Sequence, residues 1–171
     1  MPKFQLRAMS VCGVLLAVGV LAGACGSDSK KAASTTTEAS TTTVASTSAN
    51  GNTTFALSAN LTGAAEAPAP GDVDGSGRAK ITLDPAKGEA CYDITVANVD
   101  TPTAAHIHKG PAGTAGNVVI GLTPPTQGKA TGCVPADPVL IADIVANPAQ
   151  YYVNVHNAAY EKGAVRGQLS K

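Results

Sequence analysis

Two segments of the last third decide the fold: Ala104-Ala105-His106-Ile107-His108-Lys109-Gly110-Pro111-Ala112-Gly113, and Tyr151-Tyr152-Val153-Asn154-Val155-His156, which leads to Gly163-Ala164-Val165-Arg166-Gly167-Gln168-Leu169. Both segments have the composition and spacing of β-strands, in which successive side chains point to opposite faces. The three histidines of the chain all lie in these segments. We therefore expect the histidines to stand on rigid strands.

Further short segments of the same kind precede and separate these two. Glycine- and proline-rich turns divide the expected strands, which are 55–61, 78–83, 90–99, 103–108, 118–122, 129–134, 151–156 and 164–169. One helix is expected after Asp137, which can cap it, with Pro138 at its first position and apolar residues at helical spacing up to Asn147. The pattern predicts an all-β, antiparallel Greek-key β-sandwich of about seven or eight strands with one short helix.

The N-terminus has the organisation of a secretory signal. Lys3 and Arg7 form a basic start, and an uncharged apolar stretch follows up to Ala24, too short for a membrane-spanning helix. Small residues directly before Cys25 resemble a bacterial lipoprotein signal. The resemblance implies that residues 1–24 are removed and that Cys25 carries lipid. Cleavage by the ordinary signal peptidase, which would leave a free thiol, is the alternative.

Residues 25–52 read as a lipidated cysteine followed by a disordered linker. The segment is rich in Ser and Thr, and Val44 is its one large aliphatic residue, so it buries too little apolar area to offset the entropy of ordering. The folded domain is expected over residues 53–171. We therefore expect localisation on the extracytoplasmic face of a cell membrane.

The remaining cysteines predict a disulfide. Cys12 would be removed with the signal, which leaves Cys91 and Cys133 as an even pair in an exported domain. Two ligating thiols are the alternative, and no second cysteine stands near either one at metal-ligand spacing.

The charge balance argues against a nucleic-acid partner. Lysine plus arginine and aspartate plus glutamate number 12 each, and loss of Lys3 and Arg7 leaves two excess negative charges. With no basic stripe and few aromatic residues, neither phosphate tracking nor base stacking is expected.

Several separated motifs resemble the CHRD domain, named for chordin. They are the histidine segment 104–113, Gly116-Asn117-Val118-Val119, Tyr152 to His156 and Gly163 to Leu169, after an opening at Leu57 to Asn60 and Glu66 to Pro68. The resemblance covers about Phe55 to Leu169 and marks Asn154, Arg166 and Gln168 as structural motif residues. It implies an exported β-rich module without a reaction. In chordin the domain is associated with binding a secreted growth factor, so an extracellular protein or glycan partner is left open.

The histidines allow two interpretations. His106 and His108, two apart on a strand, point to one face, and His156 could join them if the strands adjoin; paired imidazoles suit copper or zinc. The alternative is structural: a ring N–H bonded to a backbone carbonyl would fix the glycine-rich turn after Lys109. A resemblance to the His-x-His strand of copper–zinc superoxide dismutases stops there, because this chain has too few histidines for that activity.

No catalytic residues are expected. The domain contains no nucleophile elbow and no carboxylate pair forced together by spacing, so it is not expected to be an enzyme. Arg166 is expected to pair with Glu161, Asp93 or another carboxylate and so to fix the terminal strand; binding an anionic ligand is the alternative. The interpretation that results is a lipid-anchored envelope protein that displays a binding or structural module, with copper or zinc binding by His106, His108 and His156 as the alternative.

Overall fold

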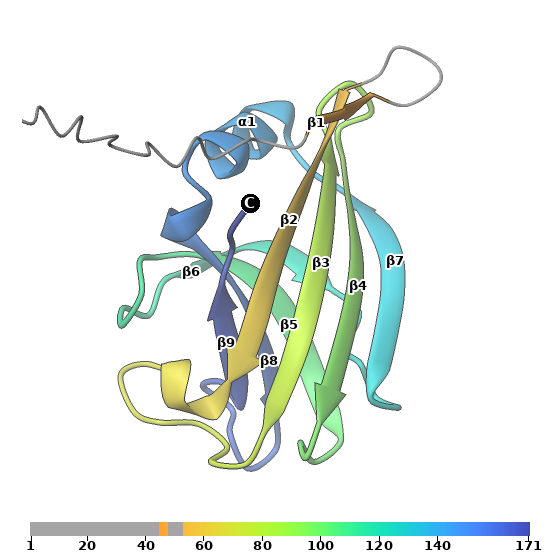
Figure 1. Ribbon diagram of the computed structural model, residues 1–171. Coiled ribbons are helices and arrows are strands. Elements are labelled where there is room, and N and C mark those ends of the chain that lie inside the picture. Colours follow the sequence, from red (N-terminus) through yellow and green to blue (C-terminus); the bar gives the residue numbers. More distant parts are fainter. Residues whose placement is uncertain (1–44, 48–52) are drawn as a thin grey trace, which may run out of the picture. The chain divides into compact units, whose positions relative to one another are not determined.

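The computed structural model describes residues 45–47 and 53–171 (Figure 1). The predicted signal 1–24, the predicted lipidation residue Cys25 and most of the predicted linker lie outside these residues. The strands are β1 (Ala45–Thr47), β2 (Thr53–Thr62), β3 (Ser76–Asp84), β4 (Glu89–Ala97), β5 (Pro102–Lys109), β6 (Asn117–Leu122), β7 (Lys129–Pro135), β8 (Tyr151–Asn157) and β9 (Val165–Gln168). The helical segments are η1 (Gly63–Ala65), α1 (Pro138–Ala146) and η2 (Pro148–Gln150).

Strands β2 to β9 form one antiparallel sheet in the order β6-β5-β8-β9-β2-β3-β4-β7. The sheet curves until its end strands β6 and β7 approach each other, which makes a nearly closed barrel (Figure 1). The predicted all-β antiparallel fold with one short helix is confirmed. The strands belong to a single curved sheet, and β1, which falls within the predicted linker, pairs with the start of β2.

The core lies inside the curved sheet and follows the two-residue period of the strands. Aliphatic side chains from every part of the sheet meet there, among them Leu61, Ile81, Leu83, Ile94, Ile107, Val153, Val155 and Leu169. The expected strand 90–99 ends early: β4 stops at Ala97, because Asn98 takes a left-handed backbone conformation with φ of 56°.

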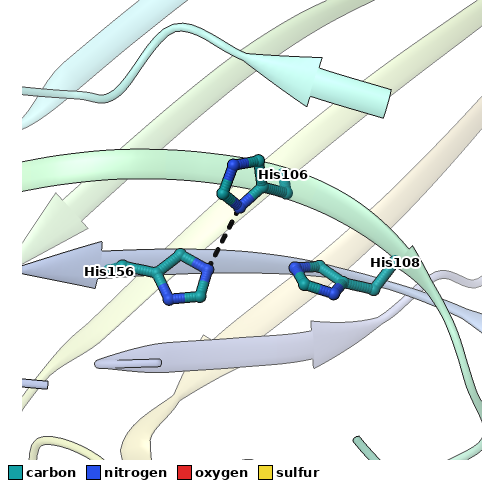
Figure 2. A group of neighbouring side chains, drawn as sticks. All are labelled: His106, His108 and His156. Carbon is teal, nitrogen blue, oxygen red and sulfur yellow. Dashed lines mark hydrogen bonds between the residues drawn. The ribbon is translucent and has the colours of Figure 1, made fainter. Parts of the chain in front are cut away.

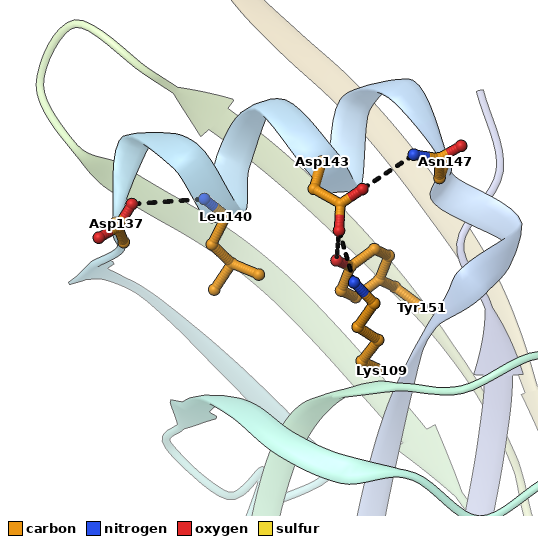
Figure 3. A network of polar contacts seen from close by, with 6 residues as sticks. All are labelled: Lys109, Asp137, Leu140, Asp143, Asn147 and Tyr151. Atoms are coloured by element: carbon orange, nitrogen blue, oxygen red, sulfur yellow. Dashed lines mark hydrogen bonds and ion pairs between the residues drawn. The ribbon is translucent and has the colours of Figure 1, made fainter.

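The predicted helix is confirmed with its predicted cap. The Asp137 side chain accepts hydrogen bonds from the backbone N–H groups of Val139 and Leu140, and Pro138 opens the helix. Asp143, on α1, accepts from Lys109 Nζ at 2.7 Å and from the Tyr151 hydroxyl (Figure 3). These contacts tie α1 to the adjoining ends of β5 and β8. No helix within the described residues has the length and apolar character needed to cross a membrane.

The predicted disulfide is confirmed. Cys91 on β4 lies directly opposite Cys133 on β7, and their sulfur atoms are bonded at 2.08 Å. The bond joins β4 and β7, the two strands at one end of the sheet. Because both sulfurs are in the bond, neither is a thiolate ligand for a metal.

Candidate functional site: three histidines on the outer face of the barrel

The three histidines share the outer face of neighbouring strands. Along β5, Ala105 and Ile107 point into the core, so His106 and His108 point outward. On β8, His156 stands on the same side, opposite Ala104 of β5. The structure therefore brings together the three residues that the sequence suggested.

Polar side chains fill the rest of this outer face. Asn154 of β8 lies between His106 of β5 and Arg166 of β9 in the register of the three strands, while Tyr152 lies between His108 and Gln168. All seven residues of β8 are buried, although every second one is polar or aromatic and points away from the core. The face is buried because loops cover it.

Arg166 holds one of these covering loops. Its guanidinium lies 3.5 Å above the Tyr152 ring and donates hydrogen bonds of 2.9 Å to the carbonyls of Pro111 and Thr114 and to Gln168 Oε1. Gln168 donates to the carbonyl of Gly110 at 3.1 Å. The glycine-rich segment 110–116 is thereby fixed over the sheet.

The fixed loop in turn orients His108. Gly116 O lies 2.9 Å from His108 Nδ1, and the His108 ring stacks on Tyr152 with centroids 4.8 Å apart. Residue 116 has to be glycine, because a Cβ there would lie 1.8 Å from the carbonyl oxygen of Lys109. A carbonyl only accepts hydrogen bonds, so Nδ1 carries the proton and Nε2 of His108 bears a lone pair.

His156 is oriented in the same way by another loop. Its Nδ1 lies 3.0 Å from the carbonyl oxygen of Glu161, so its Nε2 also bears a lone pair. That Nε2 lies 3.2 Å from Nδ1 of His106. Figure 2 shows a nitrogen of each ring turned toward the space between the three rings, and one ligand atom from each histidine lies within 4.8 Å of the others.

The environment favours neutral histidines. Burial is the main cause that lowers the pKa of His106, His108 and His156 below the usual value, and neighbouring positive charges, such as Arg166 beside His108, add to it. Nε2 of His108 is buried and has no hydrogen-bond partner. A neutral imidazole with an unused buried lone pair is the form of histidine that ligates a metal.

Two residues of the site escaped the sequence reasoning. Tyr152 lies between His108 and Arg166, but in the sequence nothing distinguishes it from other aromatic residues in a β-strand. Glu66 follows η1 and reaches Asn154, whose Nδ2 lies 3.5 Å from Glu66 Oε2. Burial raises the pKa of Glu66 to about 7 against the lowering effect of Arg166. The one sequence feature that points to Glu66 is its position after Leu57 to Asn60, in the segment that resembles the start of the CHRD domain.

The two named partners expected for Arg166, Glu161 and Asp93, were wrong. Arg166 is 1% exposed and donates to carbonyl oxygens and an amide oxygen, whereas Glu161 and Asp93 accept none of its hydrogen bonds. Glu66 is the carboxylate close enough for its pKa to respond to Arg166. The expectation that Arg166 fixes the terminal strand is consistent with these bonds, which join β9 to segment 110–116.

A comparison with protein families covers the part of the chain that holds these residues. Residues 57–169, which include every residue of the histidine site, match the CHRD domain family. Searches of curated proteins and of solved structures found no match. Because the family match spans well over half of the chain, the protein belongs to the CHRD domain family.

Proposed function

We propose that this protein is an exported, lipid-anchored cell-envelope protein whose CHRD domain binds one copper or zinc ion through His106, His108 and His156. One observation carries the metal proposal: two of the three rings are held by their Nδ1–H groups so that their bare Nε2 atoms face the third ring. Metal-ligating histidines characteristically donate their other N–H to a carbonyl or carboxylate in this way.

The distances fit a small ion. Zinc–nitrogen bonds of about 2.0–2.1 Å at tetrahedral angles place two ligand nitrogens about 3.3 Å apart. His106 Nδ1 and His156 Nε2 are 3.2 Å apart, close to this separation, and one ligand atom from each of the three histidines lies within 4.8 Å of the others. Imidazole ligands suit copper and zinc better than calcium or magnesium.

A bound metal would also provide a partner for a buried nitrogen atom that otherwise has none. Without an ion, His106 Nδ1–H can donate to His156 Nε2, but the buried Nε2 of His108 accepts nothing. An unsatisfied buried polar atom costs about 1–3 kcal/mol. The structural role of the histidines uses Nδ1 and the proposed metal role uses Nε2, so the two roles are compatible for His108 and His156.

Replacement by asparagine separates these roles. The Asn Nδ2 atom takes nearly the place of His Nδ1, so His108→Asn and His156→Asn keep a donor to the loop carbonyl and remove the Nε2 ligand. Wild-type protein should retain one equivalent of Cu²⁺ or Zn²⁺ after dialysis and show a higher Tm with metal. Each Asn variant should lose both effects and keep the metal-free Tm near that of the wild type.

Equal metal content and equal Tm shifts in the wild type and in the double variant His108→Asn/His156→Asn would refute the metal proposal. In that case the histidines would serve only to fix the loops. Metal content is measured by elemental analysis of the dialysed protein, and Tm by circular dichroism.

The envelope location rests on separate features. The basic start, apolar stretch and small residues before Cys25 support export and lipidation, and the Cys91–Cys133 disulfide supports an oxidising compartment. The lipid would make the membrane one partner, and an extracellular protein or glycan is the class proposed for the other. No nucleic-acid partner and no catalysed reaction are proposed.

Lipidation predicts incorporation of a labelled fatty acid in growing cells, and Cys25→Ala should abolish it. Cys12→Ala is the matched control, because Cys12 lies in the segment that would be removed. Label that persists in Cys25→Ala, or that is absent from the wild type, would contradict the anchor without affecting the metal proposal.

A further inference from the structure

We propose that the ion bound by the three histidines keeps a fourth coordination position that takes a small anion from solvent, on the side of His106. This inference rests on the proposed metal site and goes further, because it assigns the site a ligand class. The donor count, the burial of the three rings and the charge of the donor set support it.

The protein supplies three donors. Within residues 45–47 and 53–171, no fourth histidine, cysteine, aspartate or glutamate joins the cluster of His106, His108 and His156. Zinc sites with a structural role are closed by four protein ligands, whereas sites with three protein ligands complete the ion with a water or an exchangeable ligand. The donor count therefore places this site in the second class.

The burial of the three rings shows where that position faces. His108 is 7% exposed beneath segment 110–116, and His156 is 9% exposed with its Nδ1 tied to the loop at Glu161. His106 is more exposed than either, and Ala104, two residues before it on the same face of β5, is also only partly buried. Solvent reaches the cluster on the β5 side.

The charge of the donor set selects an anion. Three neutral imidazoles leave the full charge of a divalent ion uncompensated, unlike sites that contain carboxylate or thiolate ligands. The Arg166 guanidinium, stacked on Tyr152, adds a second positive charge beneath His108. Glu66 is the nearby acid, and its carboxylate is directed to Asn154 rather than to the histidines.

Azide with Cu²⁺-loaded protein tests the position. Copper binding is measured first by elemental analysis, and azide is then added while absorbance and electron paramagnetic resonance are followed. The wild type should show a saturable charge-transfer band with a stoichiometry of one azide per copper, and copper should stay with the protein on filtration.

Ala104 offers a matched pair of variants. Ala104 lies opposite His156 in the register of β5 and β8, so a longer side chain at residue 104 can reach the open side of the ion. Ala104→Glu should supply its own anion, bind copper more tightly and lose the azide response. Ala104→Gln has the same shape without the charge and should keep the response.

The outcomes distinguish the two proposals. A wild-type protein that binds no copper refutes the proposed function and this inference together. Bound copper without an azide band, or copper released by azide into the filtrate, overturns the open position and leaves the metal site standing. An azide response that survives in Ala104→Glu overturns its placement beside His106.

Discussion

Apolar and polar residues alternate along the strands in both halves of the barrel. The outward-facing polar side chains are exposed in one half and buried in the other. In the half formed by β3, β4 and β7, the outward residues meet solvent: Lys80 and Asp93 lie opposite each other, and Asp93 contacts Lys129 at 3.3 Å in an exposed pair. In the half formed by β5, β8 and β9, the outward pair Asn154 and Arg166 is 2% and 1% exposed.

The comparison shows that loops which cover a polar face must also supply hydrogen-bond partners for its side chains. Burying a polar group without a partner destabilises a fold, so each covered side chain needs a hydrogen bond. Segment 110–116 and the loop at Glu161 provide most of them as carbonyl oxygens. Buried atoms without a hydrogen-bond partner remain there on Glu66, His108 and Asn154.

The largest expected effect concerns the solvent-facing half. The disulfide closes a separation of 42 residues, and its removal in Cys91→Ala/Cys133→Ala should lower the free energy of unfolding by about 4 kcal/mol in the chain-entropy model. Urea denaturation measures this loss. Metal affinity of the folded variant should match that of the wild type, because the bond lies on β4 and β7. A parallel loss of metal affinity would show that the two halves are coupled.

The next effect concerns the covered half. Arg166→Ala removes a buried cation together with hydrogen bonds to two carbonyls, and should lower the free energy of unfolding by about 3 kcal/mol. Arg78→Ala is the matched control, since Arg78 also occupies a strand but is exposed, and should change stability by less than about 0.5 kcal/mol. Similar losses in both variants would contradict the distinction between the halves.

The pH dependence of stability should also arise from the covered half. The folded-state pKa values of the three histidines lie below 6.5, so the folded protein binds fewer protons than the unfolded chain as pH falls below 6.5. Their contribution to stability is therefore complete above pH 6.5 and is lost on acidification. Urea midpoints of metal-free protein, measured from pH 8 to pH 5, report this loss.

Glu66 acts in the opposite direction within an overlapping pH range. Its folded-state pKa of about 7 exceeds the usual 4.5, so its contribution is complete below pH 4.5 and is lost as pH rises toward 7 and above. Glu66→Gln should thus raise the urea midpoint at pH 8 more than at pH 5 and steepen the histidine-dependent loss. A midpoint difference that is the same at both pH values would show that Glu66 does not titrate in this range.

The architecture could be predicted from local patterns because those patterns are physical causes of the elements. The two-residue period of the strands puts Ile81, Ile94 and Ile107 in the core, and Asp137-Pro138 marks the start of the helix. The disulfide followed from counting cysteines. These features depend on neighbours in the chain or on pairing rules, so a single sequence suffices to find them.

The candidate site was predictable in its histidines but not in its surroundings. His106 and His108 share a strand, and periodicity alone puts them on one face. Periodicity does not show that this face is covered, because the cover depends on where segment 110–116 lies in the tertiary structure. The expected pairing of Arg166 with Glu161 or Asp93 was wrong for the same reason: two of the acceptors are backbone carbonyls, which residue identity does not reveal.

The smallest effect is expected at the exposed contact between α1 and the adjoining ends of β5 and β8. Asp143 accepts from Lys109, Tyr151 and Asn147, and these bonds hold the pKa of Asp143 at about 2 (Figure 3). Because the contact is solvated, solvent screens it, so Asp143→Asn should lower the urea midpoint only slightly. Faster amide exchange in α1, with exchange in β8 unchanged, would place the effect in the helix. Faster exchange throughout β8 would instead mean that the covered half depends on α1 as well as on its loops.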